Sequence, residues 1–279
     1  MGVLNGKVAL VTGAASKRGM GRAIAVRLAK EGADVAVLDK FAAPKSIWLG
    51  DEGWGGLDAV VEEIQKQGRK GLALVADVSK GAEVDEAVKK TVDRLGKLDI
   101  LVHAGGIRGA MTTKIVDLSE EEWRTALDIN LTGSFLIAKA AAKAMIPNGE
   151  GRKIVLFGSK AATQGYVGSA GYCASKHGVL GLGRTLALEL APYKINVNII
   201  NPGGFDTNLR DQAIIQRAKA QGIPLEKAVE EESKKVGPGN NVPLGRLGKP
   251  EEIADLVFFL VSDQSAYITG KTIDIDGGA

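Results

Sequence analysis

Near its start the chain reads VALVTGAASKRGMG at residues 8–21, an unbroken apolar run that ends in a glycine-rich turn. Helical periodicity follows from Arg22 to Glu31. Glycines allow a backbone to approach a pyrophosphate closely, and the amides at a helix N-terminus then donate hydrogen bonds to it. A buried strand, a glycine loop and a helix in this order therefore predict an α/β fold with a dinucleotide-binding loop.

An acidic residue at the end of the next apolar run supports this interpretation. Asp39 lies twenty residues after Gly19, where a carboxylate can accept hydrogen bonds from both hydroxyls of an adenosine ribose. The same carboxylate would repel the additional phosphate of NADP, so NAD is expected as the cofactor. Lys17, Arg18 and Lys40 keep NADP open as the less favoured alternative, because a 2′-phosphate binds to cations.

Seven short apolar runs alternate with amphipathic stretches along the chain. The runs show little polar alternation, which is typical of parallel strands buried on both faces. They are Val8 to Val11, Val35 to Leu38, Leu72 to Val75, Ile100 to Val102, Ile154 to Phe157, Ile195 to Ile200 and Thr272 to Ile275. The pattern predicts one α/β domain over residues 1–279, a doubly wound parallel seven-stranded sheet (Rossmann fold) with helices on both faces.

Two helix starts and two irregular segments complete the expected organisation. Ser119-Glu120-Glu121-Glu122 is a capping box that opens a long helix toward Met145, and Pro250 opens another helix at its first turn. Residues 40–56 form an insertion after the second strand. Residues 204–245 form a polar, largely helical excursion, which we expect to be a lid that closes over a substrate.

Composition excludes several classes of protein. The 279 residues are 45% hydrophobic and 25% charged, with a formal net charge of +3, the profile of a soluble globular protein. Basic residues are scattered and aromatic residues are 5%, so no nucleic-acid surface is expected. No apolar run approaches the ~20 residues of a membrane span, and no leader precedes the first strand. Cys173 is the one cysteine, so a cytoplasmic protein is expected. No metal site is predicted.

Four polar residues mark a candidate chemical centre. Tyr172 and Lys176 are four residues apart and so share one face of a helix. A phenol is a poor proton shuttle at neutral pH unless a neighbouring cation stabilises its ionised form. Ser159 follows the fifth strand, at the sheet edge where doubly wound folds bind ligands. Asn130 lies within a helical pattern that an amide side chain disfavours. Taken singly, the Tyr172–Lys176 spacing can be a chance surface pairing, and Asn130 can be a polar residue tolerated on a partly exposed helix face.

Together these pieces resemble the short-chain dehydrogenase/reductase family across nearly the whole chain. In order, the matching motifs are Thr12-Gly13…Gly19-Met20-Gly21, Asp39, Asp77-Val78, Asn130, Ser159, Tyr172-x-x-x-Lys176, Asn201-Pro202-Gly203 with Thr207, and Asp276-Gly277-Gly278. The resemblance implies an NAD-dependent short-chain alcohol dehydrogenase or ketone reductase. Such an enzyme transfers a hydride between NAD(H) and the CH–OH or C=O group of a small molecule, and is expected to be a homodimer or homotetramer.

The resemblance also implies residue roles. Tyr172 is the general acid/base, and Lys176 assists it and holds the nicotinamide ribose. Ser159 hydrogen-bonds the substrate oxygen, and Asn130 anchors a water that relays protons to Lys176. Cofactor contacts are expected at Gly13, Ser16, Gly19, Met20, Gly21, Asp39, Asp77, Val78, Ala104, Gly105, Gly106, Tyr172, Lys176, Pro202, Gly203 and Thr207. Substrate contacts are expected at Ile107, Arg108, Lys160, Tyr166, Gly204 and Phe205.

The chain departs from the family pattern at two motifs. Five residues separate Gly13 from Gly19, two more than usual, which leaves the phosphate contacts of the loop's middle open. His103-Ala104-Gly105-Gly106 stands where Asn-Asn-Ala-Gly is usual, and His103 is expected to pack rather than catalyse. The insertion is similar in position to that of a subgroup that holds NAD tightly. Trp48 or Trp54 would then cover the adenine end, and a packed surface loop is the alternative.

Other interpretations remain. Asp77 can meet the adenine amino group or cap the helix that begins near Ser79. A catalytically silent NAD-binding sensor or scaffold protein is the alternative function, although such relatives typically lose the tyrosine or the lysine. A sugar-nucleotide epimerase or dehydratase would need an additional substrate domain. An enoyl reductase would space its tyrosine and lysine more widely than Tyr172 and Lys176.

Overall fold

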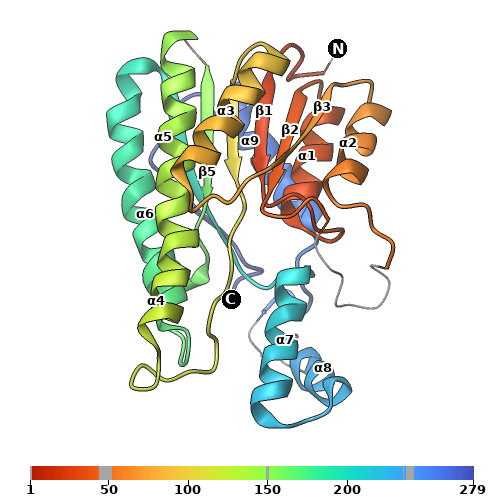
Figure 1. Ribbon diagram of the computed structural model, residues 1–279, viewed down its shortest axis with the longest axis vertical. Helices are drawn as coiled ribbons and strands as arrows, with labels where there is room; N and C mark the ends of the chain where they lie inside the picture. Colours follow the sequence, from red (N-terminus) through yellow and green to blue (C-terminus); the bar gives the residue numbers. More distant parts are fainter. Residues whose placement is uncertain (1, 44–51, 149–150, 235, 237–241) are drawn as a thin grey trace.

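A seven-stranded, all-parallel sheet is the frame of the computed structural model, which describes residues 2–43, 52–148, 151–234, 236 and 242–279 (Figure 1). The strand order is β3-β2-β1-β4-β5-β6-β7. The strands are β1 (Val8–Thr12), β2 (Asp34–Asp39), β3 (Gly71–Val75), β4 (Ile100–His103), β5 (Arg152–Phe157), β6 (Ile195–Pro202) and β7 (Thr272–Ile275). The predicted doubly wound sheet is confirmed, with strand boundaries within two residues of those expected.

The two faces of the sheet carry separate apolar clusters because neighbouring strand residues point to opposite faces. In β1, Ala9 and Val11 join one cluster and Leu10 joins the other. On the first face lie α1 (Met20–Lys30), α2 (Leu57–Lys66) and α9 (Pro250–Val261). On the second face lie α3 (Gly81–Leu95), α5 (Gly133–Met145) and α6 (Ala170–Leu190). Burial on both faces explains why these strands lack polar alternation.

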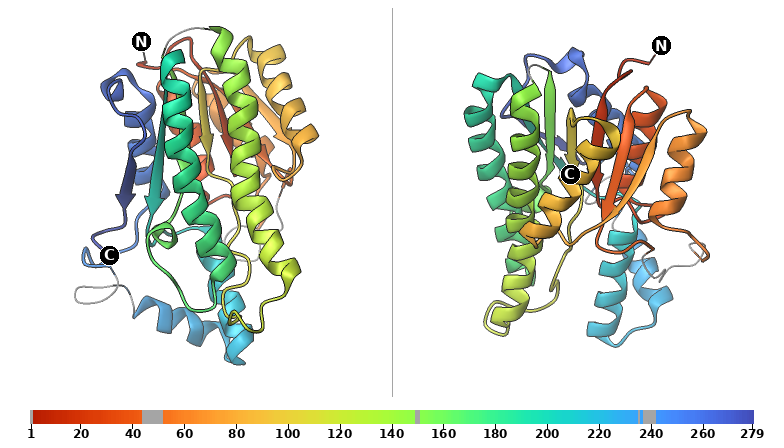
Figure 2. Two further views of the ribbon diagram at one scale, coloured as in Figure 1. Left: turned by 90° about the vertical axis from the view of Figure 1, so that its left-hand side faces the viewer. Right: turned by 45° about the horizontal axis from the view of Figure 1, so that its top comes forward.

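The long helix expected from the capping box toward Met145 is interrupted. Ser119 and Glu122 form the reciprocal cap of α4 (Glu120–Leu127), as predicted. A π-helical turn at Asp128–Thr132 then separates α4 from α5. One extra residue in a turn redirects the side chains around it, and such turns often occur at functional sites. In the left view of Figure 2, α4 and α5 run beside α6 along one side of the molecule.

Within the 204–245 segment, two helices form a hairpin beyond the carboxyl ends of the strands (Figure 1). They are α7 (Asn208–Gln221) and α8 (Leu225–Ser233). Ile214, Ala218 and Ala228 give this hairpin a small apolar cluster of its own, separate from both clusters of the sheet. In the part of the chain that the structure describes, no helix combines the length and apolar character needed to cross a membrane.

The buried face of α5 gives a prediction for stability. Ile137 is fully buried against the sheet, whereas Ile115 is 66% exposed. Ile137→Ala should lower the free energy of unfolding by about 2–5 kcal/mol, because it removes buried contacts and leaves a cavity. Ile115→Ala, the matched control, should change it by less than about 0.5 kcal/mol. Urea denaturation followed by circular dichroism measures both, and equal effects would contradict the assignment of α5 to the core.

Candidate active site

A cleft lies at the carboxyl ends of the central strands, where doubly wound sheets bind ligands. Strands β2 and β3 lie on one side of β1, and strands β4 to β7 lie on its other side. The loops that follow β1 and β4 therefore run in opposite directions and leave a gap above this pair of strands. The cleft is lined by Met20, Ala104, Gly106, Ile107, Arg108, Phe157, Gly158, Ser159, Tyr172, Lys176, Pro202, Gly203, Phe205, Thr207 and Leu209. Residues 189 positions apart in sequence therefore share one concave surface.

The glycine loop leaves no room for side chains at two positions. Gly13 has φ +72°, and a Cβ there would lie 2.7 Å from the backbone of Gly105. A Cβ on Gly21 would lie 2.4 Å from the carbonyl oxygen of Gly13. Gly19 caps α1 without any side-chain hydrogen bond, and the first turn of α1 holds no acidic residue. The loop thus fits a pyrophosphate, because uncapped amides and the positive end of the helix dipole attract one.

A chain of hydrogen bonds joins the ends of β1 and β4. The Gly105 amide donates to Thr12 Oγ1 at 3.1 Å, and that hydroxyl lies 2.7 Å from His103 Nδ1. His103 is buried, and burial lowers its pKa from 6.5 to about 3, with the charge of Lys176 adding to the effect. As expected, His103 packs at the strand–loop junction. It is neutral there and positions the loop rather than carrying charge.

Asp39 closes the other side of the loop. Its carboxylate accepts hydrogen bonds from the amides of Ala15 at 3.0 Å and Lys40 at 2.8 Å. Burial raises the pKa of Asp39, while backbone amides oppose that rise. Trp54 packs behind the loop and donates its indole N–H to the Ala15 carbonyl at 2.8 Å. Trp48, the other tryptophan of the insertion, lies outside the described residues.

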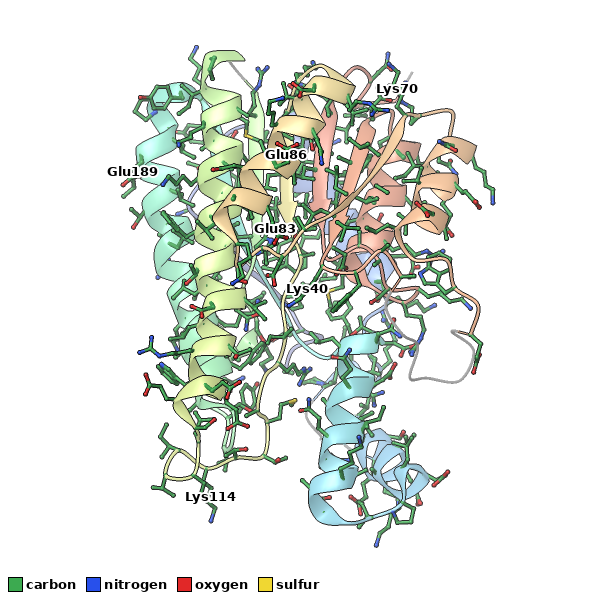
Figure 3. All side chains as sticks on the ribbon, in the orientation of Figure 1. Lys40, Lys70, Glu83, Glu86, Lys114 and Glu189 are labelled. Carbon is green, nitrogen blue, oxygen red and sulfur yellow. The ribbon has the colours of Figure 1, made fainter. Side chains whose placement is uncertain are left out.

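Lys40 and Arg18, which lie near the loop, have acidic partners. Lys40, labelled in Figure 3, contacts Asp77 at 2.9 Å. Although partial burial alone would raise it, the pKa of Asp77 falls to about 2 because Lys40 and Ser79 donate hydrogen bonds to the carboxylate. Arg18 pairs with Asp206 at 3.0 Å and also with Asp211. Both partners of Arg18 flank the start of α7, so the glycine loop is joined directly to the hairpin.

Tyr172 and Lys176 project from one face of α6 into the cleft. The Lys176 ammonium lies 5.8 Å from the centroid of the tyrosine ring and donates to the Phe157 carbonyl at 2.8 Å. Burial lowers the pKa of Lys176 to about 8. The phenol and the ammonium thus share one helical face in the same cleft, the arrangement of a tyrosine that transfers protons beside a cation.

Asn130 occupies the π-helical turn and fixes the neighbouring loop. Its amide accepts from the Ile107 N–H and donates to the Ile107 carbonyl, both at 2.9 Å. It also donates to Ser175 Oγ at 3.1 Å. A Cβ on Gly106 would lie 3.0 Å from Asn130 Oδ1 and 3.6 Å from Lys176 Nζ. Asn130 and Lys176 therefore flank the same point of the cleft.

Ser159 is presented by a tight junction after β5. Its backbone amide donates to Asn201 Oδ1 at 3.1 Å, and its hydroxyl oxygen accepts from the Ala161 amide at 3.1 Å. That acceptance leaves the hydroxyl proton available to a substrate oxygen. Asn201 belongs to a motif identified in the sequence, but no role was predicted for it. In the structure its side chain accepts the hydrogen bond from the Ser159 amide and donates one to Asp274 at 2.9 Å.

The expected substrate contacts divide into two groups. Ile107, Arg108 and Phe205 line the cleft. Outside the cleft lining, Lys160 lies 3.7 Å from Asp276 and Tyr166 is 46% exposed, while Gly204 pairs through its backbone with Gly248. Leu209 and Phe157 line the cleft but were not among the expected substrate contacts. Leu209 follows Thr207 by two residues, and no pattern in its own segment indicated that it faces the site.

Comparison with known proteins gives concordant matches. A family model described as enoyl-(acyl carrier protein) reductase matches residues 13–279. A short-chain dehydrogenase/reductase of Armillaria gallica is 37% identical over 276 residues, which are 99% of this chain and 97% of that protein. A 3-oxoacyl-(acyl-carrier-protein) reductase of Synechocystis sp. is 36% identical over 283 residues, which are 100% of this chain and 98% of that protein.

Solved structures are similar over the whole chain. Carveol dehydrogenase from Mycobacterium avium in complex with NAD has 31% identity and a TM-score of 0.86, covering 100% of this chain and 99% of that one. An actinorhodin polyketide ketoreductase variant with NADPH has 33% identity and a TM-score of 0.84, covering 100% of this chain and 98% of that one. Both are named for reactions of an alcohol or a ketone.

The depressed pKa of His103 gives a prediction for acid stability. Between pH 6.5 and about 3, the unfolded chain binds a proton at His103 that the folded chain does not. Stability should therefore fall as the pH falls below 6.5, by at most about 1.4 kcal/mol for each pH unit from this group. In urea denaturation between pH 7 and 5, His103→Gln should flatten this dependence, whereas exposed His177→Gln should not. An unchanged slope in His103→Gln would contradict the prediction.

Proposed function

Since this chain belongs to the short-chain dehydrogenase/reductase family and is an oxidoreductase of alcohol and ketone groups, we propose that it is an NAD-dependent alcohol dehydrogenase or ketone reductase with Tyr172 as its general acid/base. The observation that carries the proposal is the pairing of Tyr172 with buried Lys176 in the cleft beside Ser159. The four-residue spacing of tyrosine and lysine also supports alcohol and ketone chemistry over enoyl reduction.

Each of the four polar residues of the site has a separate role in the proposed reaction. Ser159 donates its hydroxyl proton to the substrate oxygen and holds it near the Tyr172 phenol. When an alcohol is oxidised, the phenolate of Tyr172 accepts the hydroxyl proton; when a ketone is reduced, the phenol returns it. Lys176 stabilises the phenolate, and Asn130 holds the Ile107 loop and anchors a water that relays protons to Lys176. Bound NAD(H) supplies the hydride chemistry.

The cofactor would lie across the ends of β1 and β4. The amides of the loop at Gly19 to Gly21 would hold its pyrophosphate, and Lys176 its nicotinamide ribose. Asp39 would bind the adenosine ribose and disfavour a 2′-phosphate. Pairing of Lys40 with Asp77, and of Arg18 with Asp206 and Asp211, supports NAD further, because those cations already have anionic partners.

The position of the α7–α8 hairpin supports its proposed role as a lid. The α7–α8 hairpin acts as the lid over the cleft, since Thr207 and Leu209 at its base line the site.

The protein acts in the cytoplasm on a small molecule. It forms a homodimer or homotetramer, and the exposure of Phe135 at 43% and Leu188 at 79% on adjacent helices α5 and α6 is consistent with a covered surface.

Removing the phenol tests the proposed chemistry. Tyr172→Phe should lower kcat by at least about 10²–10⁴-fold on a panel of secondary alcohols, polyols and hydroxy acids, because no proton can be transferred. Binding of NADH, followed by its fluorescence, should persist. Tyr193→Phe, at a tyrosine 48% exposed and remote from the cleft lining, is the matched control. Undiminished turnover in Tyr172→Phe would refute the role, and NADH binding without any turnover by the native protein would favour a sensor.

Neutralising Asp39 tests the cofactor choice. Asp39→Asn should lower the ratio of kcat/KM for NAD to that for NADP by about tenfold or more, because the repulsion of the 2′-phosphate is removed. The control is Asp34→Asn at the opposite end of β2, which should leave the ratio unchanged. Initial rates at 340 nm measure both cofactors. A native enzyme that prefers NADP would contradict the assignment of NAD.

A further inference from the structure

Arg108 is a charged side chain that the proposed reaction does not use. It follows Ile107, whose backbone amide and carbonyl are both held by Asn130 at 2.9 Å. The Arg108 guanidinium therefore extends from a loop that is fixed relative to the catalytic residues. It lines the same cleft as Ser159 and Tyr172.

None of the described residues supplies a counter-charge to the guanidinium. Arg108 Nε is buried and has no hydrogen-bond partner, and no hydrogen bond or ion pair joins the side chain to another described residue. The side chain as a whole is only partly buried, so its terminal N–H groups remain available in the cleft, and an arginine there without a protein partner can pair with an anionic ligand. None of the cleft-lining residues that the structure describes is acidic.

Other cations near the site are already engaged, which separates Arg108 from them. Lys160, the other basic residue expected to face the substrate, lies 3.7 Å from the carboxylate of Asp276. Lys176 donates a hydrogen bond to the Phe157 carbonyl, and its proposed roles are to assist Tyr172 and to hold the nicotinamide ribose. Arg108 is thus the cation of this cleft whose partner the described chain does not provide.

Apolar side chains make up much of the remaining wall of the cleft. Met20, Ile107, Phe205 and Leu209 surround the space between the loop after β4 and the start of α7. A guanidinium presents a planar fork that binds carboxylate or phosphate oxygens with two parallel hydrogen bonds, and it is more weakly hydrated than an ammonium. A short apolar chain ending in an anion would fill both parts of this surface.

We propose that the substrate is a hydroxy acid or oxo acid, or a phosphorylated equivalent, whose anionic group is bound by Arg108 while its reacting carbon lies at Tyr172 and Ser159. This inference rests on the proposed dehydrogenase function and names its substrate class. Arg108 acts as a specificity-determining residue: it favours an anion over the neutral analogue of equal length, and it fixes which carbon faces the tyrosine.

Matched pairs of substrates provide the test. Each hydroxy acid in a series of chain lengths is compared with its methyl ester, and a phosphorylated alcohol of similar length is the third member. For the native enzyme, kcat/KM should be at least tenfold higher for the anionic member. Arg108→Met should lower kcat/KM for the anion about 10- to 100-fold, mainly through KM, and leave the ester unchanged, because only the ion pair is lost. Arg108→Lys should retain part of the preference.

Controls separate this proposal from the function on which it rests. Arg184→Met, at an exposed arginine of α6 outside the cleft lining, should leave every ratio unchanged. Calorimetry of the oxo acid with the enzyme–NAD complex, which cannot reduce it, should show binding that Arg108→Met weakens by the same factor, while NAD itself still binds. Equal use of acid and ester, no use of any acid, or equal losses on both in Arg108→Met would overturn the anion proposal. Esters oxidised only when Tyr172 is present would leave the dehydrogenase assignment intact.

Discussion

The close approach of two backbones is the constraint on which the site depends. Gly13 at the end of β1 and Gly105 after β4 are so near that a Cβ on Gly13 would lie 2.7 Å from the backbone of Gly105. Thr12 and His103 hold these ends together by a hydrogen bond of 2.7 Å inside the core. Because the loops diverge from this pair of strands, the geometry of the pair sets the distance between the glycine loop and α6, the helix that carries Tyr172 and Lys176.

Much of the fold could be predicted because its signals are local. The continuous apolar runs identified all seven strands, and the Ser119 cap and Pro250 marked helix starts where the structure has them. Order along the chain also allowed Asn130, Ser159, Tyr172 and Lys176 to be proposed as one group. The structure brings Lys176 and Asn130 to either side of Gly106 and lines one cleft with Ser159, Tyr172 and Lys176.

Other features arise from contacts that no local pattern encodes. The partners of Arg18 lie at Asp206 and Asp211, far along the chain. Lys160 and Arg108 looked equivalent as basic residues after strands, yet of the two only Lys160 meets an acid, Asp276, among the residues that the structure describes. The π-helical turn at Asn130 depends on one additional residue within an otherwise helical pattern, and helical periodicity does not register so small a change.

The separate packing of the α7–α8 hairpin affects which amino-acid substitutions the protein can accumulate during evolution. Its cluster of Ile214, Ala218 and Ala228 shares no member with the clusters that hold the sheet. Substitutions within this cluster therefore remove no member of the apolar clusters of the sheet, whereas those at Asp206 or Asp211 would release Arg18 of the glycine loop. The hairpin can therefore change its own packing while the sheet that frames the cleft keeps its apolar contacts.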